Sequence, residues 1–312
     1  MRTAVLALGG NALARAGERA TITNQFRHAR ESVAPIVQLA KDGWGIAIVH
    51  GNGPQVGDEL VRNEVARKLV EPLPLGVLVA NTAGWIGYML QQSLQNALRF
   101  GQVRRDVVTL ITQTLVDPYD PALSRPTKPI GHALSDELAA QLQETGIAIG
   151  RDGAGHWRRL AASPVPTGVV ELELIRRLLE QDVIVVAGGG GGPPVYDHPL
   201  LGYEGLEAVV DKDRVAAILA RQLDAEVLMI LTDVDAVYAD WGTPAARPLL
   251  RISLEQVDEL IVSGGVNEGG MKPKVQAAGD FVRNGGGRAI IARLTDGPAA
   301  LQGEAGTTIV RG

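Results

Sequence analysis

The sequence predicts an α/β fold, a three-layer αβα sandwich with a mostly parallel central sheet and a small protruding lid subdomain. Short apolar runs alternate with helical patterns along most of the 312 residues. Four of these runs end in a similar way, and one proline-rich segment interrupts the alternation. Continuously apolar strands separated by helices are typical of parallel sheets covered on both faces. We therefore expect one domain over residues 1–312, with a lid subdomain inserted at residues 118–166.

The expected strands, in chain order, are the apolar runs at 3–8, 45–49, 107–111, 183–187, 227–231 and 289–292. The helical patterns between them lie at about 24–41, 55–68, 84–98, 171–181 and 212–222. The first run, TAVLAL, follows Arg2 and could be read as the start of a signal peptide. Six apolar residues are too few for the core of a signal peptide. We expect this run to be the first buried strand.

The segment at 118–166 differs in composition from its surroundings. It contains one short helical pattern, SDELAAQLQETG, and a basic stretch, HWRRL, and it is marked by Pro118, Pro121, Pro126, Pro129, Pro164 and Pro166. The segment is too small for a full core and too regular in pattern for a linker. This composition is the basis for the predicted lid.

Four of the expected strands end in LALGGNA, AIVHGNG, VVAGGGG and MILTDVD. In open parallel sheets, ligands bind beyond the carboxyl ends of the strands, where glycine allows backbone N–H groups to approach an anion. A single glycine turn is more often a tight connection than a binding site. The repetition at several strand ends favours an anionic ligand.

The composition limits the classes of function. The formal net charge is −5, and no cluster of basic and aromatic residues suggests nucleic-acid binding. The chain has no cysteine, which excludes disulfides, thiolate zinc sites and cysteine nucleophiles. No stretch approaches the roughly 18 apolar residues of a membrane helix. We expect a cytoplasmic protein with small-molecule partners, and no nucleic-acid or membrane partner.

Several common signatures are missing from the sequence. There is no Walker pattern, and GGGGGPPV at 188–195 lacks the spacing of a dinucleotide fingerprint. There is no nucleophile elbow, and five scattered histidines suggest no metal cluster. Phosphate binding, if present, must therefore use another arrangement.

Seven stretches match one known family in order and spacing from end to end. They are LALGGNAL (6–13), VHGNGPQVG (49–57), GWIGYMLQQ (84–92), PTKPIG (126–131), EAVVDKDRVAAILA (207–220), LTDVDAVY (231–238) and MKPKVQAA (271–278). With these motifs the chain resembles the carbamate kinases of the amino acid kinase superfamily. The resemblance implies phosphoryl transfer between ATP and carbamate, typically by a homodimer that makes ATP from carbamoyl phosphate in arginine catabolism.

Two glycine loops are the expected binding site for the transferred phosphoryl group and the small acceptor. Phosphoryl transfer depends on donors placed around the moving charge rather than on covalent chemistry. Backbone and amide donors can come from Gly9, Gly10, Asn11, Gly51, Asn52 and Gly53. These loops would explain why the strand before HGNGPQVG ends in such small residues.

Two lysines, Lys128 and Lys212, are the expected catalytic cations, and Asp213 is expected to hold both by ion pairing. An ammonium group is a compact charge that suits one cluster of phosphate oxygens. Related acid kinases carry a lysine on the first strand, where this chain has Leu6 and Leu8, and the resemblance implies that Lys128 takes its place. Alternatively, Lys128 is a solvated loop charge, Asp211 caps a helix, and Asp213 is an ordinary first-turn carboxylate.

The resemblance also implies a nucleotide site, with Asp233, Val234 and Tyr238 near the base and ribose. Met271, Pro273 and Lys274 would close the other side, with Lys274 on the ADP phosphates. Mg²⁺ would be held mainly by the nucleotide phosphates, because this ion keeps water and needs few protein ligands. We therefore expect no metal-binding residue in the protein.

The sequence departs from the family pattern at Ala83, at His132, and at Gly270 and Lys272 in the nucleotide loop. Two alternative functions stay open. One is a related kinase that phosphorylates a larger acid, and the other is a binding protein for nucleotide or carbamoyl phosphate without turnover. Together, Lys128, Lys212 and Asp213 argue against a pure binding protein. Against the larger acid, no Arg or Asn set can be assigned to an amino-acid backbone.

Overall fold

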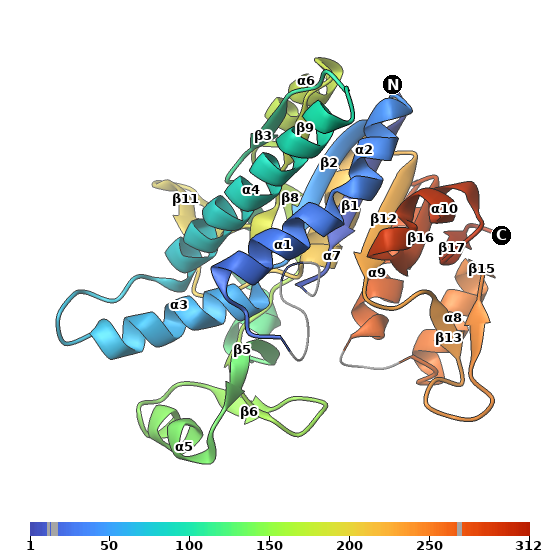
Figure 1. Cartoon of the computed structure of the whole chain (residues 1–312). Helices are drawn as coiled ribbons and strands as arrows, with labels where there is room; N and C mark the ends of the chain where they lie inside the picture. Colours follow the sequence, from blue (N-terminus) through green and yellow to red (C-terminus); the bar gives the residue numbers. More distant parts are fainter. Residues whose placement is uncertain (11–12, 14–17, 267–269) are drawn as a thin grey trace.

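The computed structural model describes residues 1–10, 13, 18–266 and 270–312. Its centre is an eight-stranded sheet with the strand order β15-β17-β16-β12-β1-β2-β9-β3 (Figure 1). All neighbouring strands are parallel except β16 and β17. The strands are β1 (Thr3–Leu8), β2 (Gly45–His50), β3 (Val107–Thr109), β9 (Ile184–Val186), β12 (Val227–Thr232), β15 (Arg251–Ser253), β16 (Arg288–Arg293) and β17 (Thr307–Val310).

Helices cover both faces of this sheet, so the predicted three-layer sandwich is confirmed. Alternate residues of β1 point to opposite faces, as a strand requires. Leu6 packs in one core with α1 (Ile22–Ser32), α2 (Ala34–Lys41), α4 (Leu75–Phe100) and α10 (Gly297–Gln302). Val5 packs in the other with α6 (Leu172–Glu180), α7 (Lys212–Gln222), α8 (Leu254–Val262) and α9 (Met271–Arg283). Burial on both faces explains why the strands are continuously apolar.

The helix predicted at 24–41 is two helices, α1 and α2. Pro35 lies in the first turn of α2. Proline has no backbone N–H and its ring clashes with the preceding helical turn, so it is tolerated only at a helix start. The chain therefore ends α1 at Ser32 and begins a new helix at Ala34.

The helix predicted at 84–98 is longer at both ends. α4 begins after Pro74 and ends before Gly101, and its buried side carries Leu78, Ile86 and Leu94 among others. Within the described ranges, no helix combines the length and the apolar character needed to cross a membrane.

Smaller sheets lie outside the sandwich. A four-stranded sheet has the order β11-β10-β4-β8, and β13 pairs with β14. These strands are β4 (Thr114–Val116), β8 (Pro166–Val169), β10 (Pro194–His198), β11 (Gly202–Gly205), β13 (Val237–Ala239) and β14 (Arg247–Leu249). Two short 3₁₀ turns, Gly189–Gly191 and Leu294–Asp296, follow β9 and β16.

Part of the segment at 118–166 forms a separate three-stranded sheet that projects from the body of the molecule (Figure 1). Its order is β5-β7-β6, from β5 (Lys128–Leu134), β6 (Ile149–Arg151) and β7 (Trp157–Ala161), and α5 (Asp136–Glu144) packs beside it. A 3₁₀ turn at Pro121–Ser124 precedes it, and β8 follows it in the four-stranded sheet. We call residues 128–161 the small sheet. Its role as a lid stays a prediction.

The small sheet meets the sandwich at α3 (Gly53–Ala66), where two backbones come unusually close. A Cβ atom added at Gly57 would lie 1.8 Å from the Cα of Gly131, which also has a positive φ of 76°. Only glycine at both positions permits this approach. The joint places β5 against the helix that follows the second glycine loop.

Candidate active site

The predicted glycine loops lie side by side at one edge of the sheet. In register, Leu8 at the end of β1 pairs with His50 of β2 on one side and with Leu231 of β12 on the other. The loops after β1, β2 and β12 therefore emerge together, and β9 is the next strand along. Gly9, Gly10, Gly51, Asn52 and Gly53 are all placed here. Asn11, predicted with them, lies outside the described residues.

The second loop encloses a cavity of about 220 Å³, which we call the transfer cavity. It brings both predicted catalytic lysines together with the glycine loops. Its lining is Gly10, Gly51, Asn52, Gly53, Pro54, Val56, Lys128, Pro129, Ile130, Gly190, Val209, Val210, Asp211, Lys212, Asp213 and Lys274.

Asp213 lies between two lysines at the start of α7. Its carboxylate accepts from Lys212 Nζ at 2.5 Å and from Lys274 Nζ at 3.2 Å. Burial acts to raise the pKa of this carboxyl, but the two ammonium groups outweigh it and hold the pKa below its usual value. Burial lowers the pKa of the Lys212 ammonium, although Asp213 opposes the shift. The cluster places two lysines around one buried anion.

The expected pairing of Asp213 with Lys128 is wrong. Lys128 Nζ donates to Asp211 Oδ2 at 2.6 Å instead. Asp211 is also the N-cap of α7, where its other oxygen accepts from the backbone N–H groups of Asp213 and Arg214 at 2.9 and 3.2 Å. Since both oxygens of Asp213 are occupied by Lys212 and Lys274, a lysine arriving from β5 meets Asp211 first.

Asn52 is held rigidly in the second loop. Its side chain is buried, and its Nδ2 donates to Thr82 Oγ1 of α4 at 2.8 Å. Gly190, in the loop after β9, packs against the same amide, where an added Cβ would lie 2.2 Å from Asn52 Nδ2. The GGGG motif therefore supports the second loop. The sequence showed the glycines but not which side chain they pack against.

Lys212 and His50 both pack against Gly51 of the second glycine loop. A Cβ at Gly51 would lie 3.2 Å from Lys212 Cδ, so glycine lets the lysine stem cross the loop closely. His50 is 1 % exposed, and its Nδ1 lies 3.1 Å from the carbonyl oxygen of Gly51. Burial lowers the pKa of His50 to about 4, so the ring is neutral at physiological pH.

A second cavity of about 320 Å³, which we call the nucleotide cavity, lies beyond the ends of β1 and β12. It brings together Asp233, Val234, Tyr238, Met271 and Lys274 as predicted, but Pro273 does not line it. Sequence reasoning missed Trp241, whose ring lies 5.2 Å from that of Tyr238. The full lining is Gly9, Gly10, Thr232, Asp233, Val234, Ala236, Tyr238, Trp241, Val266, Gly270, Met271 and Lys274.

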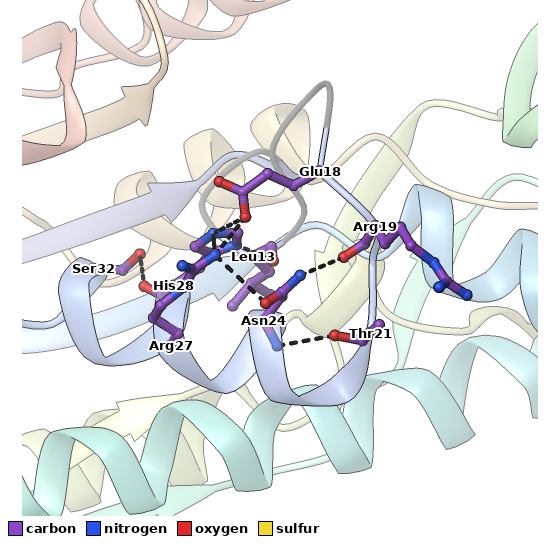
Figure 2. Close-up of polar contacts among 8 residues, drawn as sticks. All are labelled: Leu13, Glu18, Arg19, Thr21, Asn24, Arg27, His28 and Ser32. Atoms are coloured by element: carbon purple, nitrogen blue, oxygen red, sulfur yellow. Dashed lines mark hydrogen bonds and ion pairs between the residues drawn. The ribbon is translucent and has the colours of Figure 1, made fainter.

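Leu13 and Glu18 both contact α1 (Figure 2). Figure 2 shows Glu18 facing Arg27 and His28, and its carboxylate lies 3.2 Å from His28 Nε2. The other ring nitrogen of His28 lies 2.9 Å from the carbonyl oxygen of Leu13. Since His28 is 1 % exposed, Leu13 and Glu18 are both held to a buried side chain of α1.

Among the residues that the structure describes, no group of three or more His, Cys, Asp or Glu side chains could hold a metal ion. Asp211 and Asp213 are both occupied by lysines. Because these carboxylates are paired with lysines, the site suits an anionic ligand that holds any metal cation with its own oxygens.

The comparisons with known proteins agree with this geometry. The model of the amino acid kinase family matches residues 2–293. The chain belongs to the amino acid kinase family. Carbamate kinases from Pyrococcus horikoshii and Escherichia coli K12 are 42% and 43% identical to it, covering 98% and 99% of both chains. Within its family, the chain therefore groups with the carbamate kinases.

Solved structures of this branch of the amino acid kinases have the same fold. The carbamate kinase from Giardia lamblia bound to citric acid matches with a TM-score of 0.94 and 35% identity, covering 100% of this chain and 99% of that one. The same enzyme bound to AMP-PNP matches with a TM-score of 0.91. The resemblance seen in the seven motifs is thus confirmed over the whole chain.

Proposed function

We propose that this amino acid kinase transfers a phosphoryl group reversibly between ATP and carbamate. The observation that carries the proposal is that the nucleotide and transfer cavities share Gly10 and Lys274. A nucleotide in one cavity and a small acceptor in the other would meet at these two residues. Close relatives named carbamate kinase, and one solved with an ATP analogue, support the choice of substrates.

The nucleotide base would lie near Tyr238 and Trp241, and the phosphates would extend toward Gly9, Gly10 and Lys274. The transferred phosphoryl group and carbamate would lie among Gly51, Asn52, Gly53 and the two lysines of the transfer cavity. Backbone N–H groups and ammonium groups are the donors that phosphoryl oxygens require.

The reaction needs no general base, because both attacking oxygens are already anionic. In one direction a carbamate oxygen bonds to the γ-phosphorus while the bond to the bridging oxygen of ADP breaks. In the other, a β-phosphate oxygen of ADP displaces carbamate from carbamoyl phosphate. Lys128 and Lys212 would neutralise the charge that moves. Asp213 would position Lys212 and Lys274, and Asp211 would hold Lys128 near the site.

Mg²⁺ fits this donor set as a cation carried by the nucleotide phosphates, where it would neutralise their charge. We expect no protein ligand for it, because the carboxylates of the transfer cavity are paired with lysines. We further expect a homodimer that makes ATP from carbamoyl phosphate in arginine catabolism, as the family resemblance implies. The small sheet would close over the transfer cavity and move Lys128 from Asp211 onto the transferred phosphoryl group.

A coupled assay for ATP formation tests the proposal. Carbamoyl phosphate with MgADP should yield ATP, and acetyl phosphate should be a poorer donor. A larger acyl phosphate that outperforms carbamoyl phosphate would support the related acid kinase instead. ADP binding without ATP formation above an enzyme-free control would support a binding protein.

A further inference from the structure

The side-chain amide of Asn52 has two ends, and the structure places them differently. Asn52 is buried, and the space that it lines is the transfer cavity. Its Nδ2 donates at 2.8 Å to Thr82 Oγ1 of α4, and Thr82 does not line that cavity. The nitrogen of the amide therefore points toward α4, and the oxygen is the end left toward the cavity.

Thr82 determines this orientation of the amide. Its hydroxyl donates its single proton within α4, toward the carbonyl oxygens of Leu78 at 2.8 Å and Val79 at 2.9 Å. The hydroxyl therefore offers Asn52 a lone pair, which an amide N–H can use and an amide oxygen cannot. Because Thr82 is fully buried, the hydroxyl is held in this position. A reversed amide would set two oxygens against each other.

The oxygen of the same amide is free to accept a hydrogen bond. Within the described part of the chain, Asn52 Oδ1 accepts none, and it is not one of the unpartnered atoms that are sealed from the surface. Gly190, which also lines the transfer cavity, packs against the amide. A Cβ atom at Gly190 would lie 2.6 Å from Oδ1, so glycine leaves this oxygen uncovered. An accessible acceptor therefore lies at the wall of the cavity.

Most of the polar groups in the described lining of the transfer cavity are donors. Its three lysines carry ammonium groups, and its glycines contribute backbone N–H groups. Among the described lining residues, acceptor oxygens occur on the side chains of Asn52, Asp211 and Asp213 alone. Both carboxylates are paired with the lysines. Asn52 Oδ1 is thus the uncommitted side-chain acceptor in a lining of donors.

Carbamate differs from acetate in one group, an amino group where acetate has a methyl. The two N–H bonds of this group are the only donors of the substrate, since its other polar atoms are oxygens that suit the lysines and backbone N–H groups. Resting on the proposed function, we propose that Asn52 Oδ1 accepts a hydrogen bond from this amino group and so selects carbamate and carbamoyl phosphate over acetate and acetyl phosphate. A methyl group in its place would leave the buried acceptor unmet, which costs free energy.

The test compares carbamoyl phosphate with acetyl phosphate as donors to MgADP, in the wild type and in Asn52→Leu, which has a similar shape but no acceptor. The measured quantity is the ratio of the two kcat/KM values for ATP formation. Both compounds carry the same phosphoryl group, so a general loss of folding or of phosphate binding cancels in this ratio. The wild type should prefer carbamoyl phosphate at least about tenfold, and Asn52→Leu should lower the ratio about tenfold or more.

Further variants keep the test decisive if Asn52→Leu folds poorly. Thr82→Val frees the amide to turn and should also lower the ratio, whereas Thr82→Ser keeps the hydroxyl and the wild-type ratio. Asn96→Leu, at an exposed asparagine of α4, is the matched control and should behave like the wild type. An equal fall for both donors in Asn52→Leu, or a wild type that uses both equally well, would overturn this inference alone. No ATP from either donor with the wild type would contradict the proposed function itself.

Discussion

Asp211 and Asp213 lie two residues apart yet hold different lysines. Asp211 uses one oxygen to cap α7 and the other to pair with Lys128 from the small sheet. Asp213 is buried between Lys212 and Lys274. A lysine on a separate small sheet can leave its partner more easily than one inside a buried cluster. This difference suggests a mobile role for Lys128 and a fixed role for Lys212.

Substitution of the lysines should separate transfer from nucleotide binding. Lys128→Ala and Lys212→Ala should each lower the rate of ATP formation about a hundred- to a thousandfold, because each removes a donor to charge that moves in the transition state. Lys274→Ala should weaken ADP binding first, because its expected partner is a nucleotide phosphate present before and during transfer. Steady-state kinetics and ADP titration of the three variants measure both quantities.

Lys41→Ala, at the exposed end of α2, is the matched control and should retain normal turnover. If Lys128→Ala turned over normally but bound ADP poorly, the roles of Lys128 and Lys274 would have to be exchanged. If all three variants behaved like the control, these lysines would not be catalytic.

His50 should make folding stability depend on pH. Its pKa is about 4 in the folded protein against 6.5 in the unfolded chain, so the unfolded chain binds more protons between these values. The stabilisation is complete above pH 6.5 and is lost as the pH falls toward 4. Between pH 7.5 and pH 5, His50 should account for about 2 kcal/mol of the loss in free energy of unfolding. Urea unfolding at both pH values measures it.

The His50→Gln variant shows whether this loss belongs to His50, since glutamine can also donate to the carbonyl of Gly51 but does not titrate. Its free energy of unfolding should fall about 2 kcal/mol less over the same pH range. An identical loss in both proteins would assign the pH dependence to other groups.

At the scale of elements, the joint between α3 and β5 should control the position of Lys128. Gly57→Ala would place a methyl group against the backbone of Gly131 and push β5 away from α3. We expect turnover to fall at least about tenfold, because a small misplacement of a catalytic group is costly, while ADP binding stays normal. Kinetics and ADP titration test this expectation. Gly153→Ala, in the small sheet with open space around it, is the matched control and should leave turnover and ADP binding unchanged. Equal turnover in the Gly57→Ala and Gly153→Ala variants would contradict the proposed role of the contact between α3 and β5.

The small sheet should also close over the transfer cavity when substrates bind. Closure would bring Lys128 from Asp211 to the phosphoryl group and exclude water. Hydrogen exchange of residues 128–161 should therefore slow when ADP and an unreactive analogue of carbamoyl phosphate are both bound. Exchange in β1, deep in the sandwich, should not change. Equal exchange of the small sheet with and without ligands would argue against a lid.

At the scale of the whole molecule, the sandwich was predictable because the alternation of apolar runs and helical patterns in the sequence reflects strands that are buried on both faces. Strands β1, β2 and β12 are apolar along almost all of their length because helices cover both faces of the sheet. The break between α1 and α2 could have been predicted from Pro35, but the apolar pattern on either side concealed it. The small sheet was recognised only as an insertion, because its strands are short and half exposed.

The candidate site was predictable where it depends on strand ends and not where it depends on side-chain pairing. The glycine loops and the lysines meet because parallel strands end at one edge of the sheet. The pairing of Lys128 with Asp211 rather than Asp213 depends on which carboxylate oxygens other groups already occupy. Spacing in the sequence does not contain this information. Trp241 was missed because it comes from the turn between β13 and β14, outside the recognised motifs.

Direct transfer of a phosphoryl group from carbamoyl phosphate to ADP is the central claim, and phosphorus NMR follows it most directly. The spectrum is recorded over time with wild-type protein, MgADP and carbamoyl phosphate, with the Lys212→Ala variant in parallel. The carbamoyl phosphate signal should disappear at the rate at which the γ-phosphate signal of ATP grows, and the variant should be at least about a hundredfold slower. Loss of carbamoyl phosphate into inorganic phosphate without ATP, or equal rates in both proteins, would contradict the account.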